Sequence, residues 1–325
     1  MLNQLLFLGL GLTVLTIGAD WLVRGASRLA AAIGVSQLAI GLTIVAYGTS
    51  APELVVNINS ALLEKFDIAI GNVVGSNIFN VLFILGLCAL IAPLKVDQKL
   101  IKLDTPIMVT VSGLFYLAAL DYKISRFEGV IFLLGVILYT WFCFWYSKRE
   151  YQEIKNESER ISLAGLSEKN KANHVLQDLL FIGAGLLLLI VGSKWLVNSS
   201  IGIARYFGVS ELVIALTIVA AGTSLPEVAT SVVATLKGER DIAIGNVVGS
   251  NIYNILAILG VTALIPRGGL QINPASMAVD IPFMVLIAVL CYPVFRTKYS
   301  ISRWEGMMFF SMYLGYTIYL IRHNQ

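Results

Sequence analysis

The chain has 325 residues, of which 57% are hydrophobic and only 13% are charged, and its formal net charge is +3. A soluble globular domain carries roughly 25% charged residues, so this composition excludes that class and predicts an integral membrane protein whose surroundings are a lipid bilayer. A charge this close to zero gives no reason to expect nucleic acid as a partner. No obligatory protein partner is evident from the sequence.

Apolar runs follow one another along nearly the whole chain. A helix that crosses a bilayer needs about 20 mostly apolar residues. Such runs are centred near residues 14, 46, 80, 112, 136, 186, 220, 254, 286 and 312. We therefore expect an all-α fold of ten transmembrane helices. The first run has no Lys or Arg ahead of it and no small-residue cleavage site after it, so we expect a retained helix and not a signal peptide.

The second apolar run contains the stretch IVAYGTSAPE, Ile44 to Glu53, which places a carboxylate, two hydroxyls and a proline among apolar residues. The stretch returns as IVAAGTSLPE, Ile218 to Glu227, at an offset of 174 residues. A proline removes one backbone donor from a helix and crowds the carbonyl four residues earlier, so we expect each helix to break near Pro52 and Pro226. Non-helical backbone at membrane depth is tolerated only inside protein or around a cavity, where freed carbonyls can bind a cation.

Each motif is followed by an identical heptapeptide, GNVVGSN, eighteen residues after its glutamate. Residues three or four apart share one face of a helix, so hydroxyls and amides should project together with the carboxylates. An ionisable residue at mid-helix costs about 2.5–3.5 kcal/mol on insertion scales, which favours a functional role for the two glutamates. The candidate cation ligands are Glu53, Thr49, Ser50, Ser76 and Asn80 in the first copy and Glu227, Thr223, Ser224, Ser250 and Asn254 in the second.

These donors are all oxygen atoms, which suit hard cations. A flexible site with six to eight oxygens suits Ca²⁺ better than Mg²⁺, and Na⁺ accepts the same donors. The two histidines, His174 and His323, lie in a loop and at the tail, and the three cysteines fall in apolar runs without metal-ligand spacing. We therefore expect transported Ca²⁺ and Na⁺, no resident cofactor, and cysteines that act as buried apolar residues.

Two further patterns concern helix ends and packing. Asp104 and Asp280 precede Pro106 and Pro282, an arrangement typical of helix N-caps, so we assign these acids to capping and not to transport. The GxxxG pairs of the two GNVVGSN copies predict close packing of the second helix with the third, and of the seventh helix with the eighth.

The repeat divides the chain into two five-helix halves, residues 1–147 and 175–325, joined by a hydrophilic linker at 148–174. Five is an odd number, so the second half must enter the membrane from the opposite side, which makes an inverted repeat with its site near the bilayer midplane. Sixteen of the 23 Lys and Arg lie in the odd-numbered connections. Because cytoplasmic loops collect these residues, we expect a cytoplasmic linker and both termini outside the inner (plasma) membrane.

The doubled pattern GTSxPE followed by GNVVGSNIxN resembles the two alpha-repeats of the sodium/calcium exchanger family, in its prokaryotic branch. The resemblance covers the whole chain. It implies that Glu53 and Glu227 are shared cation ligands, helped by the threonines and serines given above and by the backbone carbonyls of Ala46 and Ala220. It also implies alternating access by sliding of helices one and six. Several members have Asp where this chain has Asn80 or Asn254, which leaves two formal charges in the cavity.

The leading hypothesis is secondary antiport of Ca²⁺ against Na⁺. An H⁺/Ca²⁺ antiporter could use the same two glutamates, because a carboxylate in a dry cavity can carry a proton. A cation channel would also show intramembrane acids, although two broken helices in inverted repeats favour a transporter. An enzyme is the weakest hypothesis, since Ser50 and Ser224 have no histidine base on any helix.

Overall fold

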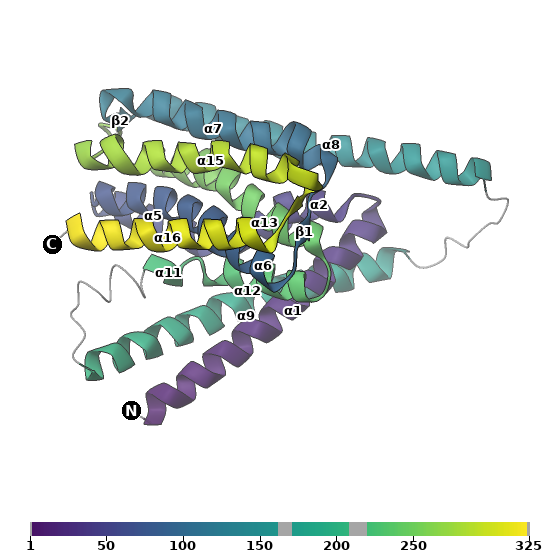
Figure 1. The fold of residues 1–325 in the computed structure, drawn as a ribbon, viewed down its shortest axis with the longest axis horizontal. Helices are drawn as coiled ribbons and strands as arrows, with labels where there is room; N and C mark the ends of the chain where they lie inside the picture. Colours follow the sequence, from purple (N-terminus) through teal and green to yellow (C-terminus); the bar gives the residue numbers. More distant parts are fainter. Residues whose placement is uncertain (1, 162–170, 208–219, 324–325) are drawn as a thin grey trace.

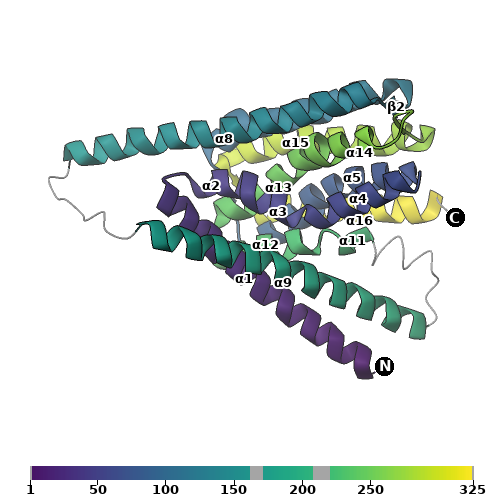
Figure 2. The ribbon, with the colours of Figure 1, turned by 180° about the vertical axis from the view of Figure 1, so that it is seen from behind.

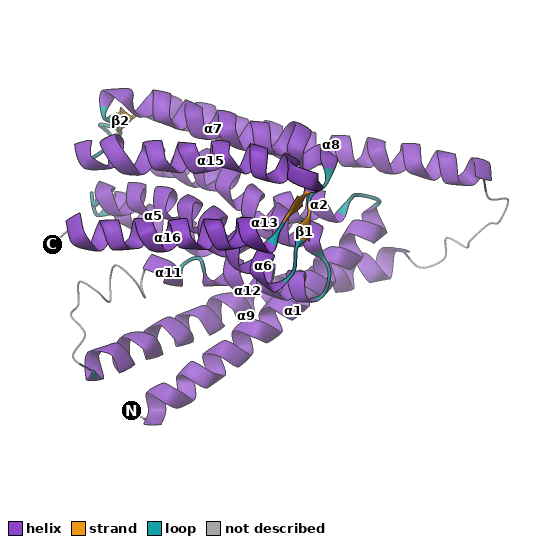
Figure 3. Cartoon of the chain, in the orientation of Figure 1, coloured by secondary structure: helices purple, strands orange, loops and turns teal. Residues whose placement is uncertain are grey.

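The computed structural model describes residues 2–161, 171–207 and 220–323 and shows the expected all-helical fold, with only two minimal sheets (Figure 3). The first half contains α1 (Leu2–Ile33), α2 (Gln37–Ile40), η1 (Gly41–Val45), α3 (Ala46–Thr49), α4 (Ala51–Leu62), α5 (Phe66–Phe79), η2 (Asn80–Leu85), α6 (Gly86–Ile91), β1 (Leu94–Lys95), η3 (Leu100–Asp104), α7 (Thr105–Ala118), η4 (Ala119–Asp121), β2 (Lys123–Ile124) and α8 (Arg126–Ile161). The second contains α9 (Lys171–Tyr206), α11 (Ala220–Gly222), α12 (Leu225–Leu236), α13 (Arg240–Tyr253), η6 (Asn254–Leu259), α14 (Gly260–Leu264), β3 (Leu270–Gln271), η7 (Ser276–Asp280), α15 (Ile281–Arg296), η8 (Thr297–Tyr299), β4 (Ser300–Ile301) and α16 (Arg303–His323).

Seven helices of the described residues are long and apolar enough to cross a membrane. The pair formed by α2–α3 and α4, bent by 44° at its break, brings the number to eight if it counts as one span. Part of the seventh apolar run predicted from the sequence lies in residues 208–219, outside the described residues. The chain is therefore a multi-span helical membrane protein.

Two helices form the centre of the bundle. The most apolar window of the span Arg240–Leu264 is 89% buried, and that of Phe66–Ile91 is 72% buried, whereas the window in α1 is 33% buried. The helices α5 and α13 thus lie inside a shell of other helices (Figure 1). They carry the two GNVVGSN copies, so the fold places both copies of the motif in the protein interior.

The glycines of the second GNVVGSN copy pack α13 against the other half of the chain. A Cβ atom at Gly249 would lie 2.5 Å from the carbonyl oxygen of Leu42, and one at Gly245 would lie 3.0 Å from that of Leu38. The sequence prediction had the glycines joining the two helices within each half. That prediction is wrong for this copy, because the close approach is between α13 and α2–η1, across the halves.

The two-stranded sheets also connect the halves. Strand β1 pairs with β4 in antiparallel register, with Leu94 opposite Ile301, and β2 pairs with β3, with Ile124 opposite Leu270. Each sheet therefore joins one loop of the first half to one loop of the second.

Helices α1 and α9 form an antiparallel pair at one side of the bundle, and both views show them diverging from it toward the N-terminus (Figures 1 and 2). At the other end, α1 is held to the core. Asp20 forms an ion pair with Lys237, which follows α12, and Ser27 Oγ donates to Glu239 Oε1 at 3.2 Å. Helix α9 is bonded to the core as well, because Ser193 Oγ donates to the backbone carbonyl of Gly222 at 2.8 Å.

The expectation that Asp104 and Asp280 cap helices is wrong. Both residues lie inside continuous helix, in η3 and η7, and neither side chain accepts a capping hydrogen bond. The helices begin seven residues earlier, where Asp97 Oδ1 accepts from Lys99 N at 2.7 Å and Asn273 Oδ1 accepts from Ala275 N at 2.9 Å. Proline is tolerated in helix here because local π-helical geometry readjusts the hydrogen bonding around it.

All three cysteines, Cys88, Cys143 and Cys291, are free and buried, as predicted.

The hydrophilic stretch 148–174 was expected to be a loop, but helix α8 continues into it as far as Ile161, and α9 begins at Lys171. Residues 162–170 of the predicted linker lie outside the described residues.

Candidate cation site

The site begins with two interrupted helices. Helix α3 ends at Thr49, α4 begins at Ala51, and the intervening Ser50 has φ −82° and ψ 9°, outside helical values. In the second half, α11 ends at Gly222, α12 begins at Leu225, and Ser224 has φ −88° and ψ 8°. The prolines occupy the first turn of α4 and of α12, where their missing N–H costs nothing. The predicted breaks are thus present.

Each break places a glutamate in the first turn of a new helix. Glu53 and Glu227 are both only 1% exposed. The N-terminus of a helix carries a partial positive charge, which stabilises a carboxylate in its first turn. The local sequence therefore provides an electrostatic reason why two acids can be buried here.

The serines at the breaks exchange hydrogen bonds between the halves. Ser50 Oγ donates to Glu227 Oε1 at 2.9 Å, and Ser224 Oγ donates to Glu53 Oε1 at 2.9 Å. Each glutamate is thus held by the half to which it does not belong. This exchange brings both carboxylates to the interface between the two broken helices.

The serines of the two central helices complete this inner cluster. Ser250 Oγ lies 3.1 Å from Ser50 Oγ, and Ser76 Oγ lies 3.3 Å from Ser224 Oγ. Ser250 Oγ also approaches the carbonyl oxygen of Ala46 at 3.5 Å. Ala220 begins α11 and stands four residues before its serine, as Ala46 does in the first half.

The threonines are oriented by asparagines that precede the central serines. Thr49 Oγ1 donates to Asn246 Oδ1 at 3.1 Å, and Thr223 Oγ1 donates to Asn72 Oδ1 at 3.4 Å. These contacts again connect opposite halves. Since a hydroxyl that donates in one direction presents its lone pairs in another, the threonines remain available as oxygen ligands.

Two residues that the sequence analysis did not single out hold these asparagines. Asn72 Nδ2 donates to Asn57 Oδ1 at 2.7 Å, and Asn246 Nδ2 donates to Ser231 Oγ at 3.0 Å. Asn57 and Ser231 stand four residues after their glutamates and 174 residues apart, so the repeat offset and the helical spacing together could have identified them.

Asn80 and Asn254 each stand where an α-helix changes to a π-helix, at the start of η2 and of η6. A π-helical turn inside an α-helix often marks a functional site. Asn80 Nδ2 donates to Asn251 Oδ1 at 3.0 Å, and Asn254 Nδ2 donates to Asn77 Oδ1 at 2.9 Å. Both side-chain amides thus donate hydrogen bonds through nitrogen, and their oxygens accept none from the described residues.

Four buried oxygens of the predicted ligands have no hydrogen-bond partner among the described residues. They are Glu53 Oε2, Glu227 Oε2, Asn80 Oδ1 and Asn254 Oδ1. Leaving a buried polar atom without a partner costs about 1–3 kcal/mol, and more when it is charged. Carboxylate and amide oxygens are ligands of the kind that hard cations take.

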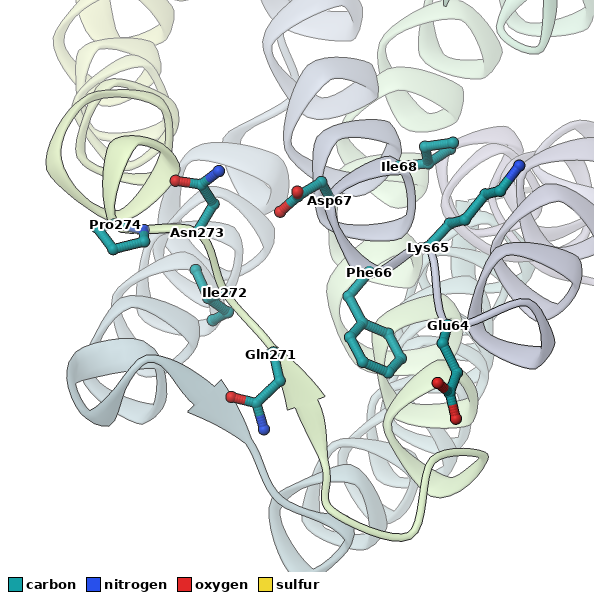
Figure 4. A pocket seen from close by; sticks show the side chains of 9 residues that line it. All are labelled: Glu64, Lys65, Phe66, Asp67, Ile68, Gln271, Ile272, Asn273 and Pro274. Atoms are coloured by element: carbon teal, nitrogen blue, oxygen red, sulfur yellow. The ribbon is translucent and has the colours of Figure 1, made fainter.

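None of these residues lines the open surface pocket between the α4–α5 turn and β3. This pocket of about 490 Å³ is lined by Glu64, Lys65, Phe66, Asp67, Ile68, Gln271, Ile272, Asn273 and Pro274 (Figure 4). Its polar side chains are exposed, and Lys65 projects away from the others (Figure 4). The two motif glutamates are instead closed off from solvent in this structure.

Comparison with known proteins identifies the family. The model of the family described as sodium/calcium exchanger protein matches residues 3–145 and again 178–322. The sodium/calcium exchanger MaX1 of Methanosarcina acetivorans is 34% identical, over 97% of both chains. The inner membrane protein YrbG of Escherichia coli is 36% identical, over 86% of this chain and 85% of its own.

Solved structures give the same result. A structure of the sodium-calcium exchanger NCX_Mj, soaked with 10 mM Na⁺ and no Ca²⁺, is 31% identical, covers 98% of each chain and has a TM-score of 0.81. Another structure of that exchanger, soaked with Na⁺ and Sr²⁺, also has a TM-score of 0.81. The resemblance inferred from the two motifs is confirmed. The chain belongs to the sodium/calcium exchanger family and is a membrane cation antiporter, not an enzyme.

Proposed function

We propose that the protein exchanges Ca²⁺ for Na⁺ across the membrane, with Glu53 and Glu227 as the charged ligands of the transported ions. The observation that carries this proposal is the set of four buried oxygens without donors, two from carboxylates and two from amides. The serine hydroxyls that bond the carboxylates, and the carbonyl of Ala46 beside Ser250 Oγ, raise the number of oxygens toward the six to eight that Ca²⁺ prefers.

The proposed architecture is ten membrane crossings arranged as two inverted five-helix repeats, 1–147 and 175–325, with a cytoplasmic linker at 148–174. Two matches of the family model, one in each half, support the repeat. We place the protein in the inner (plasma) membrane with both termini outside, on the distribution of Lys and Arg.

Orientation can be tested with a membrane-impermeant maleimide on whole cells. Because the natural cysteines are buried, new cysteines at exposed positions should dominate the labelling. Glu64→Cys, in the α4–α5 turn, should be labelled from outside, whereas Gln98→Cys, before η3, should be labelled only after the cells are opened. The reverse pattern would contradict the proposed orientation.

Alternating access is proposed to involve movement of α1 and α9 against the rest of the bundle. The divergence of both helices from the rest of the bundle toward the N-terminus supports a pair that can change its angle to the bundle (Figures 1 and 2). The coupling ion would then reach the glutamates from one side at a time.

Reconstitution into liposomes tests the exchange. Vesicles loaded with Na⁺ and diluted into Na⁺-free medium with Ca²⁺ should accumulate Ca²⁺, read by a trapped fluorescent indicator, even when a protonophore removes any pH gradient. Vesicles loaded with choline should not. Uptake that follows an imposed pH gradient in the absence of Na⁺ would instead establish H⁺/Ca²⁺ antiport by the same glutamates. Ca²⁺ flux that never saturates and shows no counterflow would establish a channel.

A further inference from the structure

Asn77 and Asn251, the last residues of the two GNVVGSN copies, are buried at the interface of the two central helices, with exposed fractions of 2% and 3%. Asn77 Nδ2 donates to the backbone carbonyl of Asn251 at 3.3 Å, and Asn251 Nδ2 donates to the backbone carbonyl of Asn77 at 3.2 Å. A backbone carbonyl can only accept a hydrogen bond. This reciprocal contact therefore determines which end of each side-chain amide is the nitrogen.

With the nitrogens bound in this way, the side-chain oxygens of the pair must point elsewhere. Asn77 Oδ1 accepts from Asn254 Nδ2 at 2.9 Å, and Asn251 Oδ1 accepts from Asn80 Nδ2 at 3.0 Å. An amide oxygen cannot pair with another amide oxygen. Asn254 and Asn80 are thus obliged to turn their nitrogens toward the pair and their oxygens away from it.

Those two oxygens are among the four buried atoms without a donor. We propose that Asn77 and Asn251 are positioning residues that orient the amides of Asn254 and Asn80, so that an oxygen and not an N–H group faces the cation. The inference rests on the proposed function of the site. Without the pair, either amide could rotate by half a turn and present a donor to the ion, which removes a ligand and adds a repulsive dipole.

The other contacts of the pair do not account for its burial. Asn77 Nδ2 lies 3.6 Å from Met284 Sδ, and Asn251 Nδ2 lies 3.8 Å from Met108 Sδ. A thioether is a weak acceptor, so these two sulfur contacts contribute little. The burial of Asn77 and Asn251 between the two central helices is explained by the hydrogen bonds that they make to each other and to the amides of Asn254 and Asn80.

A double-mutant cycle tests the assignment, read as the Ca²⁺ dissociation constant of purified protein by titration calorimetry. Asn77→Leu and Asn254→Ala should each raise this constant about tenfold, the effect of one lost interaction of hydrogen-bond strength. Because Asn77 acts only through Asn254, the double variant should also lose about tenfold and not about a hundredfold. Asn251→Leu with Asn80→Ala forms an independent second cycle with the same expectation.

Met284→Leu is the matched control, because it removes the sulfur contact of Asn77 and leaves the amide contacts intact; its Ca²⁺ affinity should equal that of the wild type. If Asn77→Leu does not fold, Asn77→Ala takes its place in the cycle. Additive losses in both cycles would overturn the positioning role, since they would mean that the pair acts by packing. The proposed exchange is tested separately by Na⁺-driven uptake of the wild type, so an additive cycle in a chain that does exchange Ca²⁺ for Na⁺ rejects this inference alone.

Discussion

Replacing Glu53 by glutamine is the sharpest test of the site, because it changes charge and hardly changes shape. The amide oxygen of glutamine can still accept the hydrogen bond that Ser224 Oγ donates at 2.9 Å. The amide nitrogen then takes the place of Oε2, the oxygen that has no partner among the described residues. The substitution therefore removes one of two negative charges and puts a donor where the cation should bind.

The expected loss can be estimated from buried ion pairs. Removing one partner of a buried pair costs about 3–5 kcal/mol. Each 1.4 kcal/mol is a factor of ten, so Ca²⁺ affinity should fall by about a hundredfold to a few thousandfold. Glu227→Gln should behave alike, because the structure gives both glutamates the same burial and the same kind of serine partner.

The assay is Na⁺-driven Ca²⁺ uptake into liposomes together with Ca²⁺ titration of purified protein. Glu64→Gln is the control, since it makes the same chemical change at an exposed turn residue outside the site. Thermal unfolding without Ca²⁺ should show no loss of stability in Glu53→Gln, because the variant has one buried charge fewer. Wild-type Ca²⁺ affinity in Glu53→Gln would refute the assignment of this residue as a ligand.

Three further predictions follow from other features of the structure. Thr49→Ala and Thr223→Ala should each weaken Ca²⁺ transport about two- to tenfold, measured as KM for Ca²⁺, because each removes one hydroxyl and one hydrogen bond to the opposite half; an unchanged KM in both would argue against threonine ligands. Gly249→Val should lower the free energy of unfolding by about 1–3 kcal/mol or more, seen as a lower melting temperature, because its Cβ would lie 2.5 Å from the Leu42 carbonyl oxygen; Gly268→Val, where a Cβ would meet no atom within 4 Å, is the control. Finally, two carboxylates are balanced by one Ca²⁺ or two Na⁺, and a third Na⁺ would be an unpaired buried charge, so exchange should not respond to a membrane potential set with valinomycin. A strong response would show that exchange is electrogenic and that the ratio is not two Na⁺ per Ca²⁺.

The sequence predicted the components of the site well. Helix breaks at the two prolines, burial of Glu53 and Glu227, and the gathering of hydroxyls and amides around them all follow from local rules on helix geometry and on the cost of intramembrane charge. The repeat offset then implied that the two clusters are equivalent. Their roles as ligands stay predictions, which the mutants above test.

What the sequence did not predict are the relations between the halves. No local pattern indicates that Ser50 donates its hydrogen bond to Glu227 and not to Glu53, which follows it by three residues in the sequence. Such pairings depend on how the halves dock. For the same reason the packing of Gly249 was assigned to the wrong neighbour.

The π-helical turns were missed for a different reason. They begin at Asn80 and Asn254 within runs whose apolar periodicity is compatible with ordinary α-helix, so no composition signal marks them. The misassigned Asp104 shows the same effect, because an acid followed by proline resembles a helix start whether the helix begins there or, as here, seven residues earlier.

The exchange of serine hydrogen bonds between the halves has a consequence for biosynthesis. Glu53 enters the membrane with the first half, while its partner Ser224 is still to be translated. During that interval the nascent chain contains an intramembrane acid whose native donor does not yet exist, and Glu227 meets Ser50 on arrival. Insertion of the second half therefore supplies the missing donor to Glu53. A ribosome stalled between the halves would leave a product in which this acid stays without its donor, and such a product is suited to recognition by membrane quality control.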